Sequence, residues 1–438
     1  MSKSTLPKLC ITSPWNYPLF NPECLTHFGG WEARITLIAK ELAPRGNFHV
    51  NLIVGDHGQP HVEQIEGVVL YSWVGRTIWG IPAQDPAPAT LAGDRSLLKK
   101  ISKQLRTVIL HRQRKASRAA PIGGQVGPHV ISPEMISIYD EVDADIYMVP
   151  GNSQFSAEVA FYCRRRDKKY VFLAGSDFDY FPEYKLYPDQ LDMYSVPHIL
   201  KVYSIEHADM HIVQNERQAM LLEEGYGRSC TVIKNPIDLT PLFPRNSDPK
   251  DILWVGKSDE RIKRPSIVLE IARQMPEYHF VIIMTYSMKG THDQCVQAAR
   301  QMSNVTLIER VPFSQIESYF ANARLHINTS VFEGFPNTFL QAAKYGVPTV
   351  SLQVDPGGML SQHGCGQLCD GDFMRFKDNI YASMNDDSLN ARLGRQSLEY
   401  VRANHDKDVI VPRYEQALIS VLADPGSPGP FTTANGRK

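Results

Sequence analysis

A regular alternation of short apolar runs with amphipathic segments extends over nearly the whole chain. Apolar runs of about four to eight residues are typical of strands buried on both faces of a parallel sheet, and the segments between them have helical periodicity. Such runs occur in both halves, at residues 9–12, 50–54, 68–73, 146–149, 170–174, 210–213, 252–255, 279–284, 305–308, 325–328 and 349–352. We therefore predict an α/β protein with two Rossmann-like, doubly wound domains that face each other across a cleft.

A stretch from 235 to 249 separates the two sets of runs, because it is rich in proline and polar residues and has no periodicity. We place the boundary near Arg245, so residues 1–245 form the N-terminal domain and residues 246–407 the C-terminal domain. Residues 408–423 are amphipathic and predict a last helix, and residues 424–438 read as a flexible tail.

Composition excludes several classes of protein. Hydrophobic residues make up 43% of the 438 residues and the net charge is -1, so the chain is typical of globular proteins and shows no general affinity for nucleic acid. No apolar stretch reaches the roughly 20 residues of a membrane span, and the N-terminus lacks a signal-peptide pattern. The seven cysteines include no CxxC pair, so we expect reduced thiols, no metal site and a cytoplasmic location.

One segment, 95–118, carries only basic charges and has apolar residues at helical spacing. Two interpretations remain open for it. It is either a surface helix that packs on its own domain, or an interfacial helix that anionic lipid attracts to the cytoplasmic face of a membrane.

Two glycines, Gly29 and Gly30, lie between the first apolar run and the amphipathic segment that follows it. Glycine lets the backbone approach a ligand closely, and free N–H groups at a helix start favour a phosphate. The alternative is a tight strand-to-helix turn without a ligand.

In the second half, Gly256, Lys257 and Lys263 follow the apolar run at 252–255. Ligands of parallel sheets bind beyond the carboxyl ends of the strands, so the two lysines are candidates to hold a diphosphate. Solvated surface lysines are the alternative.

The stretch 331–341 follows the run at 325–328 and leads into a helix, with Pro336 expected in the first helical turn. Glu333 precedes that turn and can accept hydrogen bonds from sugar hydroxyls, and Gln341 can reach a ribose. A helix that merely packs its apolar residues does not explain the polar turn. We expect this stretch to bind the donor through Glu333, Gly334, Phe335, Pro336, Asn337, Thr338 and Gln341.

These motifs together resemble family 4 of retaining glycosyltransferases, which have the two-domain GT-B fold and use nucleotide sugars without a bound metal. The resemblance rests on 255–257, 263–265, 330–337 and 355–358 in family order, with Gly29-Gly30 and 235–238 in addition. It implies a UDP-sugar or GDP-sugar as co-substrate and no cofactor. The acceptor, a hydroxyl of a glycan or of a lipid-linked molecule, would bind on the N-terminal side.

The resemblance also assigns roles to single residues. Glu333 matches the first glutamate of the family's Glu-x7-Glu motif, which contacts the donor sugar. Lys257 and Lys263 match the basic pair on the diphosphate, and Gly29 and Gly30 match the loop that faces the donor phosphate and the acceptor. The helix at 408–422 matches the segment that returns to brace the N-terminal domain.

The chain departs from the family pattern in three places. Gln341 replaces the second glutamate, and Lys257 replaces the usual arginine, which removes bidentate phosphate contact. The family's histidine is missing from 173–179, where Ser176 or Asp177 would take its role. Asp177-Phe178-Asp179 also reads as a metal-binding DxD triplet, but its place after a strand of the N-terminal half argues against this.

The sequence thus predicts transfer of a sugar from a nucleoside diphosphate to a hydroxyl with retention of configuration. Three alternatives remain: a nucleotide-sugar epimerase of the same fold, a catalytically weakened scaffold protein and a nicotinamide-dependent dehydrogenase. The dehydrogenase is disfavoured because no Gly-x-Gly-x-x-Gly follows the first apolar run.

If residues 95–118 bind anionic lipid, the full-length protein will co-sediment with phosphatidylserine vesicles at low salt. Replacing Lys99, Lys100 and Lys103 by glutamine should remove about 1 kcal/mol of binding per lysine, or roughly fivefold each. Equal sedimentation with uncharged phosphatidylcholine vesicles would contradict the lipid interpretation.

Overall fold

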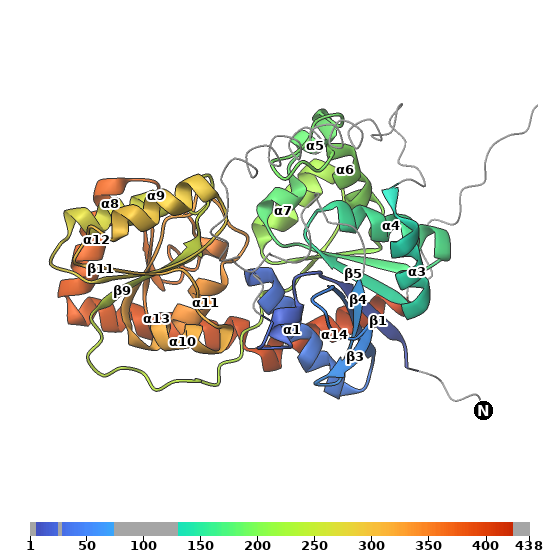
Figure 1. Cartoon of the computed structure of the whole chain (residues 1–438), viewed down its shortest axis with the longest axis horizontal. Coiled ribbons are helices and arrows are strands. Elements are labelled where there is room, and N and C mark those ends of the chain that lie inside the picture. The colour runs from blue at the N-terminus through green and yellow to red at the C-terminus, as the bar shows by residue number, and fades with distance from the viewer. Residues whose placement is uncertain (1–5, 25–28, 74–129, 424–438) are drawn as a thin grey trace, which may run out of the picture.

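The computed structural model describes residues 6–24, 29–73 and 130–423. The basic segment 95–118 and the tail 424–438 lie outside the described residues. The described chain forms two α/β domains, each built around a sheet of mainly or wholly parallel strands (Figure 1). The predicted fold class is therefore confirmed.

The sheet of the N-terminal domain has the strand order β3-β4-β2-β1-β5-β6-β7-β8. All neighbours are parallel except β3 and β4. In β1, four of the five residues are fully buried, as an apolar strand covered on both faces must be. The strands are β1 Lys8–Thr12, β2 His49–Gly55, β3 Val62–Ile65, β4 Val68–Trp73, β5 Ile146–Pro150, β6 Lys169–Leu173, β7 Met210–Val213 and β8 Thr231–Val232.

The sheet of the C-terminal domain has the order β11-β10-β9-β12-β13-β14 and is parallel throughout. Its first strand, β9, lies in the middle, where Ile252 and Leu253 are fully buried. The strands are β9 Asp251–Lys257, β10 Phe280–Thr285, β11 Val305–Ile308, β12 Ala323–Asn328, β13 Thr349–Ser351 and β14 Gly366–Leu368.

Three strands were not predicted: β3, β8 and β14. Each lies at an edge of its sheet. The residues of β3 alternate between exposed and half-buried, and β8 and β14 have only two and three residues. An edge strand packs against one neighbour only, so it does not require the continuous apolar run that identified the central strands.

Helices connect the parallel strands and cover both sheets (Figure 1). Several begin where a polar side chain satisfies free backbone N–H groups: Asp372 accepts from Met374 and Arg375 at α12, and Asn215 accepts from Gln218 at α7. The helices are η1 Tyr17–Leu19, α1 Gly30–Leu42, η2 Ala43–Arg45, α3 Pro133–Val142, α4 Gln154–Arg166, η6 Asp177–Tyr180, α5 Glu183–Leu186, α6 His198–Glu206, α7 Glu216–Tyr226, α8 Pro265–Gln274, α9 Lys289–Ala299, α10 Phe313–Asn322, α11 Asn337–Lys344, η7 Pro356–Gly358, α12 Phe373–Asn385, α13 Asp387–His405 and α14 Lys407–Ala423.

The last helix, α14, packs on the N-terminal domain beside α1, although it follows the C-terminal domain in the sequence (Figure 1). Its residues Ile410, Val411 and Tyr414 belong to the same buried cluster as Leu9 of β1. Arg34 of α1 donates to the hydroxyl of Tyr414 over 2.6 Å. The helix therefore adds apolar area to the core of a domain that lies far away in the sequence.

The chain thus passes between the domains twice, and hydrogen bonds join the two passages. The N–H of Ile237 donates to the carbonyl of His405 at 2.8 Å, and the N–H of Lys407 donates to the carbonyl of Ile237 at 3.0 Å. Nδ1 of the buried His405 lies 2.7 Å from the carbonyl oxygen of Asn235. Because neutral histidine must donate here, Nδ1 carries the proton.

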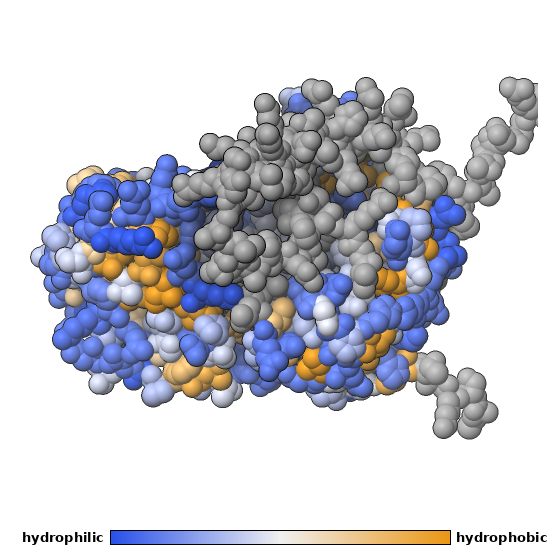
Figure 2. Space-filling model, in the orientation of Figure 1, coloured by the Kyte–Doolittle hydropathy of each residue, from blue (hydrophilic) through white to orange (hydrophobic). Residues whose placement is uncertain are grey.

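Figure 2 shows that hydrophilic residues cover most of the visible described surface, with hydrophobic residues in smaller patches. No helix among the described residues combines the length and the apolar character that a membrane span requires.

Three buried histidines predict acid sensitivity. Burial lowers the pKa of His211, His326 and His405 to about 3 in the folded protein. The unfolded chain binds a proton at each below its ordinary pKa of about 6.5. The stability associated with these neutral rings is therefore complete above pH 6.5 and is lost as the pH falls from 6.5 toward 3.

A matched variant isolates the effect of one ring. His405→Asn keeps a donor for the carbonyl of Asn235 but has no group that titrates. Between pH 7.5 and 5.5, wild type should lose about 1.4 kcal/mol more of its unfolding free energy than the variant does, as urea denaturation measures. Equal losses would show that His405 has the same pKa in the folded protein as in the unfolded chain.

Candidate functional site

Of the predicted donor-binding stretch 331–341, residues 331–336 form a loop between β12 and α11, and residues 337–341 begin α11. Pro336 was expected in the first turn of the helix, but its ψ of 126° is extended and it lies one residue before α11. The prediction was wrong by one position because proline fixes only φ, here −65°, which suits the first turn and the residue before it alike. The first free N–H group of the helix is therefore that of Asn337.

The loop brings two predicted residues together. The Nζ of Lys263 forms an ion pair with Oε1 of Glu333, and the hydroxyl of Ser330 donates to the same oxygen at 2.7 Å. A backbone hydrogen bond also joins the loop that carries Lys263 to the loop that carries Glu333, since the N–H of Val331 donates to the carbonyl of Ile262 at 2.9 Å. A carboxylate and an ammonium group thus lie side by side beyond the carboxyl ends of β9 and β12.

Lys257 is the last residue of β9, and its side chain is exposed. Gly256 precedes it and lies against the ring of Trp254, where a Cβ would come within 2.7 Å of the ring. Glycine at 256 thus makes room for the indole, whose Nε1 donates to Thr329 at 3.0 Å. This hydrogen bond joins the carboxyl end of β9, where Lys257 lies, to the residues that follow β12 and lead into the 331–336 loop.

Gly29 caps the N-terminus of α1, and Gly30 is its first residue. The N–H of Gly29, expected to face a phosphate, donates to Oε2 of the buried Glu32 at 2.6 Å. Burial raises the pKa of Glu32, and the charge of Lys257 from the other domain opposes the rise. A carboxylate of the protein itself therefore occupies the anion position at this helix start.

The domains contact each other around the same loop. Nδ2 of Asn337 donates to the carbonyl of Gly30 at 2.6 Å. Gly334 lies so close to the N-terminal domain that a Cβ would overlap Gln214 and come within 2.7 Å of the carbonyl oxygen of Gly175. The rings of Phe332 and Phe178 also meet, with centroids 4.4 Å apart.

Ser176 and Asp177, the candidates to replace the family histidine, begin the short helix η6. The hydroxyl of Ser176 accepts the N–H of Phe178 at 3.2 Å. Asp177 accepts from Gln218 at 3.2 Å and pairs with Arg217 at 2.9 Å, and burial raises its pKa against the pull of Arg217. Both side chains are thus held within the N-terminal domain.

Asp179, the other carboxylate of the triplet, is buried and accepts three backbone N–H groups, from Asn152, Gly175 and Ser176, at 2.7 to 2.9 Å. It shapes the turn after β6. Asp177 therefore bonds side chains of α7, whereas Asp179 bonds backbone N–H groups.

Gln341 lies on α11 and is half-buried, as is Thr338. Among the described residues, none hydrogen-bonds the side-chain amide of Gln341.

Sequence reasoning missed four residues of this region: Glu32, Gln214, Asn215 and Gln218. Nδ2 of Asn215 lies 3.5 Å from the carbonyl oxygen of Gly334, and the two glutamines border Gly334. Asn215 stands before an amphipathic segment and was recognisable as a helix cap. No sequence signal indicated that the first turn of α7 faces the 331–336 loop of the C-terminal domain.

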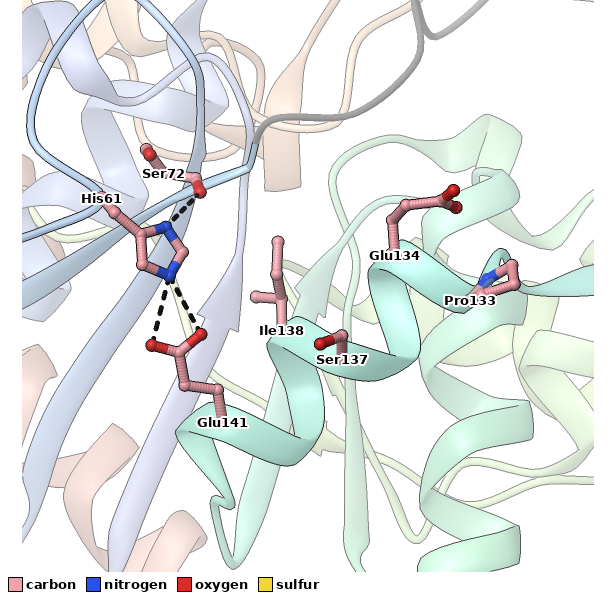
Figure 3. A pocket seen from close by; sticks show the side chains of 7 residues that line it. All are labelled: His61, Ser72, Pro133, Glu134, Ser137, Ile138 and Glu141. Atoms are coloured by element: carbon pink, nitrogen blue, oxygen red, sulfur yellow. Dashed lines mark hydrogen bonds and ion pairs between the residues drawn. The ribbon is translucent and has the colours of Figure 1, made fainter.

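A surface hollow of about 520 Å³ lies elsewhere, between β3, β4 and α3 (Figure 3). His61 bridges it, with Nε2 2.9 Å from Glu141 and Nδ1 3.2 Å from the carbonyl oxygen of Ser72. Glu141 raises the pKa of His61. No predicted site residue lines this hollow, so we do not include it in the site.

Comparison with known proteins gives a family match for part of the chain. Residues 249–386 match the family model described as glycosyl transferases group 1. The chain is also 25% identical over 170 residues to the lipopolysaccharide 1,6-galactosyltransferase of Salmonella typhimurium, a match that covers 36% of this chain and 46% of that protein. The chain thus matches less than half the length of this relative.

Solved structures resemble nearly the whole chain. Sucrose-phosphate synthase from Thermosynechococcus elongatus has a TM-score of 0.68 at 15% identity, over 95% of this chain and 99% of that one. Anabaena HepE in complex with UDP-glucose has a TM-score of 0.64 at 15% identity, over 94% and 100%. The chain has the GT-B fold.

The close contact of Gly334 predicts the effect of one methyl group. In Gly334→Ala the new Cβ meets the backbone of Gly175, which cannot move as a side chain can, so the domains should separate. We expect a larger radius of gyration by small-angle X-ray scattering. Unfolding free energy should change little, by about 0.5 kcal/mol, because neither core is altered.

Gly290→Ala is the matched control, since no heavy atom lies within 4 Å of a Cβ at Gly290. An unchanged radius of gyration in Gly334→Ala would mean that the contact between the domains does not set their separation.

Proposed function

We propose that this protein is a retaining glycosyltransferase of family 4 that moves a sugar from a nucleoside diphosphate to a hydroxyl group. The observation that carries the proposal is the pair Lys263–Glu333. It stands at the carboxyl ends of the C-terminal strands and beside the residues that contact the N-terminal domain. In this fold, ligands bind at that edge of a parallel sheet.

The pair suits both halves of a sugar diphosphate. Lys263, with Lys257, stabilises the negative charge that grows on the departing diphosphate. Glu333 is then free to accept hydrogen bonds from the sugar hydroxyls, with Ser330 keeping its carboxylate in place. The N–H groups at the start of α11 face the anionic part of the donor, and Gln341 binds the ribose.

No strong protein nucleophile is required. The bond between the anomeric carbon and the diphosphate oxygen breaks, and the acceptor oxygen forms its bond on the same face of the sugar. The proton of the acceptor hydroxyl passes to the departing diphosphate oxygen, which balances the charges. The contacts of Gly334 and Asn337 with the N-terminal domain would exclude water from this step.

The donor is a UDP-sugar or GDP-sugar, and no metal or other cofactor takes part. HepE has been solved with UDP-glucose, and the partial relative is a galactosyltransferase, which favours a hexose. The acceptor is a glycan or a lipid-linked glycan on the cytoplasmic side. Residues 95–118 would bring the enzyme to an anionic membrane surface.

The test begins with nucleotide binding. Calorimetry with UDP and GDP, followed by a thermal-shift screen of their sugars, identifies the donor through the stabilisation that a bound ligand produces. A protein that binds neither nucleotide is a scaffold, and one that converts the donor without an acceptor is an epimerase. Either result overturns the proposal.

With the donor known, Glu333→Gln tests the role of the carboxylate. A hydrogen bond to a charged group contributes about 1.5 to 3 kcal/mol, so transfer should fall by roughly 10- to 150-fold. Glu270→Gln on α8 is the control, because the partners of Glu270 among the described residues are its helix neighbours Arg273 and Gln274. Normal transfer by Glu333→Gln would show that Glu333 does not contact the sugar.

A further inference from the structure

Trp31, the second residue of α1, is a large aromatic side chain that remains 36% exposed. Its indole lies against two glycines, Gly151 after β5 and Gly175 after β6. A Cβ at Gly151 would overlap the ring, and a Cβ at Gly175 would come within 2.8 Å of it. Gly151 also has a φ of +73°, so its backbone too disfavours a larger residue.

The ring is held in one orientation. Its Nε1 donates to Oε1 of Glu32, whose other oxygen accepts the N–H of Gly29. The indole therefore cannot turn without breaking a bond to a buried carboxylate. A rigid aromatic surface binds a ligand at low cost in conformational entropy.

The position of the ring relates it to the donor site. Gly175, which contacts Trp31, also places its carbonyl oxygen against Gly334 of the 331–336 loop. On the other side, a Cβ at Gly29 would lie 3.5 Å from Nζ of Lys257. Trp31 thus lies on the N-terminal domain, at the carboxyl ends of its strands. Through Gly175 and Gly29 it neighbours Gly334 and Lys257, which are both proposed to hold the donor.

The exposure of Trp31 sets it apart from a packing residue. Trp73 and Trp254 are 9% and 2% exposed, as tryptophans in a core are. The C–H groups of a pyranose form a flat apolar face that complements an indole, while the hydroxyls at the rim need polar partners. Glu32 bonds the indole, Asn337 bonds the carbonyl of the adjacent Gly30, and Lys257 lies beside Gly29, so polar groups border the first turn of α1.

We propose that Trp31 is the platform on which a pyranose ring of the acceptor packs, and that the acceptor is therefore a glycan and not a simple alcohol. This inference rests on the proposed function, because it places the acceptor hydroxyl beside the donor loop. It makes Trp31 a specificity-determining residue.

Fluorescence tests the proposal directly. The double variant Trp15→Phe/Trp79→Phe keeps Trp31 together with Trp73 and Trp254, which are both buried, so Trp31 is its exposed fluorophore. In the presence of UDP or GDP, methyl glycosides of glucose, galactose, mannose and N-acetylglucosamine are added at millimolar concentration. At least one should protect Trp31 from acrylamide quenching.

A second measurement uses transfer itself, with the glycoside that protects Trp31 as acceptor. Trp31→Ala should raise the KM for that acceptor about tenfold, which corresponds to roughly 1.4 kcal/mol, and Trp31→Phe should raise it less. The dissociation constant of the nucleotide should stay within about twofold. Trp15→Phe, at a tryptophan that is 39% exposed, is the control and should leave the acceptor KM unchanged.

The outcomes separate the two proposals. If wild type binds no nucleotide, the proposed function fails first. If nucleotide binds but no glycoside protects Trp31, or if Trp31→Ala leaves the acceptor KM unchanged, the platform is overturned while the transferase remains. Should Trp31→Ala not fold, the quenching result on the double variant decides alone.

Discussion

The hydrogen bonds between the two passages of the chain hold the molecule together as one unit. Ile237 pairs with His405 and Lys407, and the buried ring of His405 donates to Asn235. These bonds place the start of α14 beside the linker, so α14 can reach the core of the N-terminal domain. They add to the contacts that Asn337, Gly334 and Phe332 make with the N-terminal domain.

The 331–336 loop is attached to this junction. Nδ2 of Asn235 donates to the carbonyl of Phe335 at 3.1 Å, and the ring of Phe335 lies 4.6 Å from that of His405. The neighbouring Gly334 meets the N-terminal domain without room for a methyl group. A rotation of the domains about the junction would therefore change the surroundings of the 331–336 loop directly, and under the proposed function it would couple closure to donor binding.

The central strands could be predicted from sequence because burial on both faces demands continuous apolar runs, as in β1 and β10. The edge strand β3 could not, since half of its residues face solvent. Within the candidate site, Glu333 and Lys263 were recognisable from the motifs that follow two strands. Their pairing with each other depends on a contact between loops 70 residues apart. The bond of Glu32 to the N–H of Gly29 is a local capping box that the spacing of the two residues could have indicated. The influence of Lys257 on the pKa of Glu32 comes from the other domain, and no local pattern encodes it.

The carboxylate of Glu32 has a consequence for which anions the site can hold. In the free protein the helix start already has its negative partner, and Lys257 already has a neighbouring negative charge. A lone inorganic phosphate would have to displace a group that is covalently tethered and therefore present at high effective concentration. Under the proposed function, a nucleotide sugar would compensate for this displacement through further contacts along the C-terminal domain. An enzyme that works as proposed would thus resist small competing anions through a carboxylate of its own.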